Sequence, residues 1–332
     1  MRYRDLGSRT GLRVSEIGLG AWGLGGAVRL PEADAVNTYG DVSDEAARAV
    51  LELAVRSGIT LVDTAPWYGA GRSEERIGRV LKGRSDVVVV SKVGEFIDER
   101  GRTVRDWSRE GIFRQFDASR RRLDRDVIDV DLLHTPTPAE YGGGASLDAL
   151  HALKAAGKVR FIGISIGPGE AGDQSFFRYF LEQADVDVLE APLSLLQPEA
   201  AEYLPAAQRR GLGVIARGTL RSGLLSGQIT RDTVFGPDDR RSAWPREFLD
   251  RQLTRAEQLA FLWSGGRRTQ AQAALQWVLS HDGVSTLIAG AMTPAEIREN
   301  VAVPELPPLS DEALARVRAL HGSPAGATAP TR

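Results

Sequence analysis

The feature that most constrains the fold is a regular alternation of two kinds of segment along the chain. Short apolar segments typical of strands are separated by longer segments with the apolar spacing of helices. Strands that are apolar on both faces, each followed by a helix, are typical of parallel βα units. The strands are predicted at residues 17–19, 61–63, 87–92, 130–134, 160–165, 188–191, 213–217 and 286–289.

The segments between these strands predict helices with recognisable start and stop signals. Ser43 precedes the first helix and Gly58 follows it, as expected for an N-cap and a C-terminal glycine. The helices are predicted at residues 43–57, 73–81, 108–123, 147–156, 176–183, 198–209, 269–280 and 310–321.

Eight βα units predict a (β/α)8 TIM barrel, a fold that needs about 250 residues plus insertions. An α/β doubly wound open sheet is the alternative. RYRDLG and LRVSEIG, joined by a turn, predict an N-terminal β-hairpin. We expect one barrel domain over residues 1–322 and a disordered tail over residues 323–332.

Two long segments interrupt the alternation, residues 25–42 after the first strand and residues 220–250 after the seventh. Loops longer than about 12–15 residues are usually functional or mobile. Loops that follow barrel strands surround the active site. These two loops, with the loop after residue 134, are therefore expected to shape a pocket at the C-terminal face of the barrel.

Composition excludes several classes of function. The net charge is −2, which gives no electrostatic signature of nucleic-acid or anionic-membrane binding. The chain has no cysteine, so disulfides and thiol catalysis are excluded. The first residues lack an apolar signal segment and no stretch reaches membrane-spanning length, so a cytoplasmic protein with a small-molecule partner is expected.

Two short motifs have the spacing of known functional sites but lack the required context. GLGAWG at residues 18–23 has the glycine spacing of a dinucleotide-binding turn, which needs a helix starting within the motif. GISIG at residues 163–167 has the spacing of a hydrolase nucleophile elbow, which also needs an immediate helix. Neither segment is followed by a helical pattern, so both interpretations are disfavoured.

Polar residues end three consecutive apolar strands: Asp63, Lys92 and His134, with Tyr68 on the loop after Asp63. Each alone has a structural explanation: a turn cap, a lysine that reaches solvent, a histidine at the rim. A buried charge is costly unless it is paired, and strand ends of a barrel converge on one mouth. Together, therefore, the four residues indicate a catalytic site.

This set suits proton transfer to a carbonyl oxygen. A phenol has a pKa of about 10, and an ammonium group beside it stabilises the phenolate and lowers that pKa. Lys92 would act in this way on Tyr68, while Asp63 would be the charge partner of Lys92. A neutral imidazole at His134 would orient the carbonyl or relay the proton.

The same residues resemble the aldo-keto reductase family. The segments that carry the resemblance are DTAPWYGAGRSEERIG, VVVVSKVG, DVIDVDLLHTP, GKVRFIGIS, IARGTLRSGLLSG and AGAMTPAEIREN, within residues 3–321. The resemblance implies a barrel whose hairpin covers the bottom, and NADPH or sometimes NADH bound across the mouth. It also implies hydride transfer to an aldehyde or ketone, with Tyr68 as general acid, Lys92 as its tuner, Asp63 holding Lys92, and His134 orienting the carbonyl.

The resemblance further places the cofactor contacts on twelve residues, several of which depart from the family pattern. Ile166 replaces an asparagine, Glu190 a glutamine and Arg217 an aromatic residue that stacks on the nicotinamide. Met292 stands where many relatives have a basic residue for the 2′-phosphate, and Glu296, replacing glutamine or arginine, would repel that phosphate. The set is Trp22, Ser165, Ile166, Glu190, Arg217, Gly218, Leu220, Gly290, Met292, Glu296, Glu299 and Asn300.

Aromatic residues near the predicted mouth suggest a substrate that is sugar-like or a flat natural product. Trp22, Trp67, Phe96 and Trp107 are the candidates for lining the pocket. Three hypotheses follow: a nicotinamide-dependent oxidoreductase acting on a carbonyl or alcohol, a redox-silent lyase or isomerase such as a dehydratase, and a non-enzymatic nucleotide-sensing subunit. The lyase would use Tyr68, Lys92 and His134 only to move protons. Substrate, direction and oligomeric state are left open.

Overall fold

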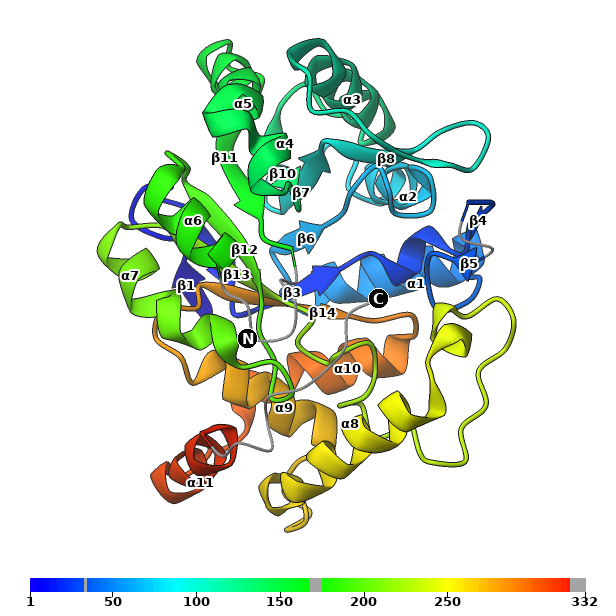
Figure 1. The fold of residues 1–332 in the computed structure, drawn as a ribbon, viewed down its shortest axis with the longest axis vertical. Coiled ribbons are helices and arrows are strands. Elements are labelled where there is room, and N and C mark those ends of the chain that lie inside the picture. Colours follow the sequence, from blue (N-terminus) through cyan, green and yellow to red (C-terminus); the bar gives the residue numbers. More distant parts are fainter. Residues whose placement is uncertain (33–34, 168–174, 323–332) are drawn as a thin grey trace.

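The computed structural model describes residues 1–32, 35–167 and 175–322, so the tail predicted at residues 323–332 lies outside the described residues. Eight parallel strands close into a barrel, because the last strand pairs with the first (Figure 1). The predicted (β/α)8 barrel is confirmed and the open-sheet alternative is wrong. In barrel order the strands are β3 (Ile17–Gly20), β6 (Leu61–Asp63), β7 (Val88–Val93), β10 (Ile128–His134), β11 (Val159–Ser165), β12 (Val188–Pro192), β13 (Gly213–Arg217) and β14 (Thr286–Gly290).

Most of the predicted helices are present, with bounds shifted by one or two residues. They are α1 (Asp44–Arg56), α2 (Arg72–Val80), α3 (Arg109–Arg122), α5 (Ala145–Ala155), α6 (Ser175–Gln183), α9 (Gln270–Leu279) and α11 (Asp311–His321). The helix predicted at residues 198–209 is split into a 3-10 turn, η3 (Glu199–Tyr203), and α7 (Leu204–Arg209). Within the described part of the chain, no helix combines the length and apolar character needed to cross a bilayer.

Several elements were not predicted from the sequence. Two further helices are present: α8 (Arg246–Gln258) lies between β13 and α9, and α10 (Pro294–Val301) follows β14. A short helix, α4, follows β10. Two small antiparallel sheets extend from the loops. These elements are α4 (Pro138–Tyr141), α8 (Arg246–Gln258), α10 (Pro294–Val301), β4 (Arg29–Leu30) with β5 (Ala35–Val36), and β8 (Glu95–Ile97) with β9 (Thr103–Arg105).

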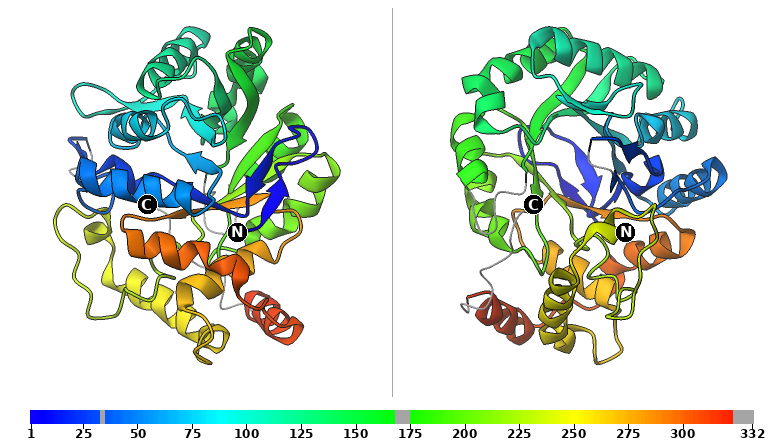
Figure 2. Two further views of the ribbon diagram at one scale, coloured as in Figure 1. Left: turned by 180° about the vertical axis from the view of Figure 1, so that it is seen from behind. Right: turned by 45° about the vertical axis from the view of Figure 1, so that its right-hand side comes forward.

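The N-terminal hairpin, β1 (Tyr3–Asp5) and β2 (Arg13–Ser15), closes one end of the barrel (Figure 2, left). Leu6 and Val14 are fully buried in one cluster with the apolar side chains that fill the barrel interior. Gly7, which has a φ of 68°, lies so close to the start of β13 that a Cβ atom would come within 2.3 Å of the Gly213 nitrogen. The predicted hairpin therefore seals the end opposite the carboxyl ends of the strands.

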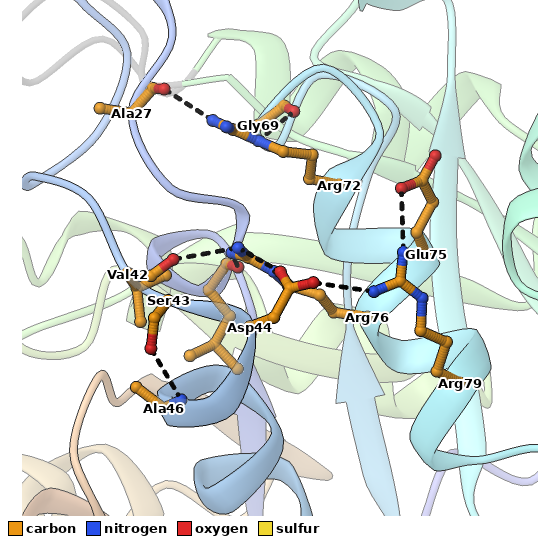
Figure 3. Close-up of polar contacts among 11 residues, drawn as sticks. Ala27, Val42, Ser43, Asp44, Ala46, Gly69, Arg72, Glu75, Arg76 and Arg79 are labelled. Atoms are coloured by element: carbon orange, nitrogen blue, oxygen red, sulfur yellow. Dashed lines mark hydrogen bonds and ion pairs between the residues drawn. The ribbon is translucent and has the colours of Figure 1, made fainter.

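The first long loop, residues 25–42, is fastened to α2 by two arginines (Figure 3). Arg76 donates hydrogen bonds to the carbonyl oxygens of Leu24 and Val42 and to the carboxylate of Asp44. Arg72 donates to the carbonyl oxygen of Ala27 at 2.6 Å. Both ends of this loop are thus held beside the carboxyl ends of β3 and β6.

Candidate active site

A cavity of about 790 Å³ lies at the carboxyl end of the barrel. Its walls are formed by residues at the ends of barrel strands and by the loops that follow them. Three of the four predicted catalytic residues line it, namely Asp63, Tyr68 and His134. The strand-end convergence that the sequence predicted is therefore present.

Lys92, the fourth, is fully buried on β7 just beneath the cavity. Its Nζ atom donates to Oδ2 of Asp63 at 2.5 Å, to the carbonyl oxygen of Thr64 at 3.0 Å and to the hydroxyl of Tyr68 at 3.2 Å. An ammonium group has three hydrogens, and these contacts use all of them. Because the Tyr68 oxygen accepts from Lys92, its own hydrogen is left to be donated to a ligand in the cavity.

Burial determines how these groups ionise. Burial alone would lower the pKa of Lys92, but the carboxylates of Asp63 and Glu190 outweigh it and raise that pKa. Burial also raises the pKa of Tyr68 above its usual value near 10, and the opposing effect of Lys92 is too small to reverse the shift. Lys92 thus lowers the pKa of Tyr68, as expected from the sequence, but burial, which the sequence did not reveal, raises that pKa by more. Tyr68 is a neutral phenol, the form that donates a proton.

His134 ends β10, and its ring centroid lies 5.9 Å from that of Tyr68 with the planes at 81°. Burial, reinforced by the positive charges of Lys92 and Arg217, lowers its pKa well below 6.5. The imidazole is therefore neutral at physiological pH. The next residue, Thr135, has a φ of 55°, a conformation that non-glycine residues rarely adopt and that is often found at functional sites.

Three further polar residues, Ser165, Glu190 and Arg217, lie beside the four predicted catalytic residues, at the ends of β11, β12 and β13. The Ser165 hydroxyl donates to Oε1 of Glu190 at 2.8 Å, and Arg217 donates to the carbonyl oxygen of Ile166 at 2.6 Å. Oε2 of Glu190 lies 3.5 Å from Nζ of Lys92. This last contact joins β12 to β7, which are not neighbours in the barrel, so the sequence carried no signal for it.

Another part of the cavity wall includes Gly290 at the end of β14, and Met292 and Glu296 near the start of α10. Oε2 of Glu296 accepts hydrogen bonds from the backbone nitrogens of Met292 at 2.8 Å and Thr293 at 2.9 Å. A carboxylate is thus fixed at this wall. Gly218 and Leu220 also line the cavity.

Three predicted cofactor contacts lie outside the lining formed by the described residues. Ile166 is buried and contributes only its carbonyl oxygen to Arg217. Glu299 points to another helix, where its carboxylate accepts from the Thr269 hydroxyl at 2.5 Å. Asn300 is buried on α10.

Of the four predicted aromatic lining residues, Trp22 and Trp67 face the cavity, with ring centroids 6.0 Å apart. Phe96 and Trp107 are not part of its described walls. Phe96 lies on the β8–β9 sheet, and the Trp107 ring packs directly against Gly94, filling the place that a Cβ atom would occupy. Both residues follow a predicted strand end in the chain, but closeness along the chain does not fix the direction of a side chain.

The two long loops meet over the cavity. The Tyr39 hydroxyl donates a hydrogen bond to the Ser222 hydroxyl at 3.1 Å. The backbone nitrogen of Arg240 donates to the carbonyl oxygen of Thr38 at 2.8 Å. The Arg240 guanidinium lies 4.9 Å from the centroid of the Trp22 ring. The sequence predicted that both loops shape the pocket, but it did not single out Tyr39, Ser222 or Arg240.

The cavity has the chemistry that a nicotinamide dinucleotide requires. Six buried polar atoms in its walls have no hydrogen-bond partner among the described residues: Nε1 of Trp22, Nδ1 of His134, Oε2 of Glu190, Oγ1 of Thr219, and Nε of Arg217 and Arg221. The guanidinium groups suit the negatively charged pyrophosphate. Glu296 does not suit an additional phosphate, because its carboxylate would repel it.

Comparisons with known proteins agree with this geometry. The sequence model of the Aldo/keto reductase family matches residues 16–321 of this chain. NADH-specific methylglyoxal reductase of Escherichia coli (strain K12) is 31% identical over 91% of this chain and 93% of its own length. Pyridoxal 4-dehydrogenase of Microbacterium luteolum is 31% identical, covering 90% and 91%. The holo form of aldo-keto reductase AKR11C1 from Bacillus halodurans superposes with a TM-score of 0.75, at 28% identity over 96% of both chains.

Proposed function

The chain belongs to the aldo/keto reductase family, and we propose that Tyr68, Lys92, Asp63 and His134 catalyse its reduction of a small aldehyde or ketone. It is a nicotinamide-dependent oxidoreductase. The redox-silent lyase or isomerase finds no support in the relatives described above. The nucleotide-sensing subunit differs from an enzyme in lacking turnover, which the assay below measures.

The observation that carries this proposal is the hydrogen-bond inventory of Lys92. All three of its hydrogens are used, one of them on the Tyr68 oxygen, so the Tyr68 hydrogen is free for a carbonyl oxygen in the cavity. A bound nicotinamide dinucleotide would supply the hydride that adds to the carbonyl carbon. Tyr68 supplies the proton to the carbonyl oxygen, which completes the alcohol. His134, neutral and facing the same space, orients that oxygen.

The test is turnover of methylglyoxal and pyridoxal, the compounds in the names of two relatives, and of a simple aromatic aldehyde. Tyr68→Phe removes the proton donor and keeps the ring, so kcat should fall by about 10²-fold or more. Tyr39→Phe, the same change at another tyrosine of the cavity wall, should cost far less. A Tyr68→Phe enzyme with the kcat of the wild type and a native circular dichroism spectrum would refute the assignment of Tyr68.

We further propose that the enzyme prefers NADH to NADPH. Glu296 is fixed at the cavity wall by two backbone nitrogens, and Met292 beside it offers no positive charge. A 2′-phosphate near Glu296 would be repelled, because the phosphate and the carboxylate are both negatively charged. The relative from Escherichia coli is named as NADH-specific, which supports the same preference.

Titration of tryptophan fluorescence with each cofactor tests this preference. We expect the Kd for NADH to be about tenfold lower than that for NADPH, which corresponds to ~1.4 kcal/mol. Glu296→Gln should bring the two Kd values closer together, because glutamine has nearly the shape of glutamate but no charge. Glu299→Gln is the matched control on the same helix, and its carboxylate is bound to Thr269 outside the cavity wall. A ratio that Glu296→Gln leaves unchanged would contradict the proposal.

A further inference from the structure

Glu190 is a second fully buried carboxylate beside Lys92, and its two oxygens have different surroundings. Oε1 accepts a hydrogen bond from Ser165. Oε2 lies 3.5 Å from Nζ of Lys92 and accepts no hydrogen bond from any residue in the described ranges. Because the three hydrogens of Lys92 already go to Asp63, Thr64 and Tyr68, the contact with Glu190 is purely electrostatic.

Charged and titratable groups face Tyr68 from five strands of the barrel. Lys92 on β7 donates to its hydroxyl, and Asp63 on β6 binds the same ammonium. His134 on β10 meets the Tyr68 ring at its edge, and its imidazole is neutral. Glu190 lies on β12. On β13, Nε of Arg217 lies 3.6 Å from Oε1 of Glu190.

Lys92 therefore serves two carboxylates and one phenol. Burial and the charge of Glu190 raise the pKa of Asp63 well above 3.8, so at neutral pH Glu190 carries more of the negative charge that faces Lys92, and above the pKa of Asp63 both carboxylates are charged. A second carboxylate at 3.5 Å adds a negative charge that Arg217 offsets only from the far side. Charges at such distances interact strongly in a buried site, because little water screens them. A negative charge here disfavours a second one on the Tyr68 oxygen.

We propose that Glu190 is a positioning residue for the Tyr68 proton: its charge offsets that of Lys92 and keeps the Tyr68 hydroxyl protonated. This inference rests on the proposed function of Tyr68 as proton donor. Lys92 and Arg217 overcome the effect of burial and lower the pKa of Glu190, which is therefore charged at neutral pH. Burial raises the pKa of Tyr68, and Glu190 acts in the same direction.

The pH range over which the enzyme can catalyse reduction follows from this assignment. Reduction consumes the proton of a neutral phenol, whereas oxidation of an alcohol requires Tyr68 to take a proton up as phenolate. With Glu190 in place, the phenol form, which reduction requires, persists into the alkaline range. Glutamine at this position would keep an acceptor for Ser165 but carry no charge.

The test measures the Tyr68 proton directly, without cofactor or substrate. The chain has six tyrosines, and carbon-13 NMR of protein labelled at tyrosine Cζ follows the ionisation of each, with Tyr68→Phe identifying the Tyr68 signal. In Glu190→Gln the Tyr68 midpoint should fall by about one pH unit. Glu95→Gln is the matched control: Glu95 lines the same cavity but pairs with Arg105 at 3.3 Å, so the midpoint should not move. Glu190→Ala removes the same charge and repeats the test should Glu190→Gln fold poorly.

Kinetics give a second readout that a purely structural role would not move. The alkaline limb of the pH profile for reduction should move down by the same amount in Glu190→Gln. An unchanged Tyr68 midpoint in the folded variants overturns the role of Glu190, whether or not the wild type turns over. A wild type that turns over no carbonyl refutes the proposed function, while the titration still decides the role of Glu190.

Discussion

At the scale of single residues, the buried acids of this protein differ in how their charge is accommodated. Asp63 binds Lys92, and Glu74 accepts from Ser91 at 2.6 Å and from Arg122 at 2.7 Å. Asp131, in the middle of β10, is buried with no hydrogen-bond partner for either oxygen among the described residues. Burial, together with the nearby Glu74, raises the pKa of Asp131 to about 8. A buried carboxyl group without partners is thus kept neutral.

This environment makes stability depend on pH. The pKa of Asp131 rises from 3.8 to about 8 on folding, so the folded state holds a proton that the unfolded state loses first. The free energy of unfolding should fall as pH rises through that interval, by up to ~1.4 kcal/mol per pH unit. Asp131→Asn cannot ionise and should lose this dependence. In urea unfolding, its stability relative to wild type should therefore be greater at pH 8 than at pH 5.

Asp126→Asn is the control for that comparison, because Asp126 is an exposed acid just before β10. Its stability relative to wild type should stay nearly constant between the two pH values. A constant difference for Asp131→Asn as well would show that Asp131 is charged in the folded protein.

At the scale of elements, the first long loop depends on α2 for its position. Arg76 is buried and donates to the carbonyl oxygen of Leu24, just before the loop, to that of Val42 at its end, and to the carboxylate of Asp44, which begins α1 (Figure 3). Arg76→Met keeps much of the side-chain volume but leaves those acceptors without a donor. Hydrogen bonds to charged groups contribute about 1.5–3 kcal/mol each, and the variant should lose at least about 2 kcal/mol in urea unfolding.

Arg79→Met is the matched control, because Arg79 binds the same Asp44 carboxylate at 2.9 Å from an exposed position. Exposed ion pairs contribute about 0–1 kcal/mol. Equal losses in the two variants would show that the buried carbonyl contacts of Arg76 do not hold the loop. The loop carries Tyr39 to the cavity, so Arg76→Met should also weaken cofactor binding.

Secondary structure was predictable where apolar patterns were strong. All eight barrel strands followed from short apolar runs, because strands covered on both faces leave little room for polar residues. Of the three helices that the sequence did not predict, the two longer ones, α8 and α10, were missed for identifiable reasons. α10 buries only Ile297 and Asn300, so its apolar pattern is weak, although Thr293 and Glu296 form a capping box that could have revealed it. α8 begins within residues 220–250, a polar segment that was predicted to be a loop. Leu249, Leu253 and Ala256 nevertheless have helical spacing.

At the scale of the whole molecule, the barrel converts chain order into spatial order. Asp63, Lys92 and His134 could be predicted to converge because the carboxyl ends of all barrel strands face one way. The contact between Glu190 and Lys92 could not, because it depends on which side chains reach across the barrel. The bond between Tyr39 and Ser222, 183 residues apart, depends on two irregular loops whose paths no periodic pattern encodes.

The filled hydrogen-bond positions of Lys92 also bear on stereochemistry. With the ammonium on one side of the phenol oxygen and His134 at the edge of the ring, the acidic hydrogen has a narrow range of directions. A carbonyl oxygen that accepts that hydrogen is therefore held at one place in the cavity, and the two substituents of a ketone must fit the walls on either side of it. Under the proposed reaction, walls that admit the two substituents of a ketone in one arrangement only would make the product a single mirror-image alcohol.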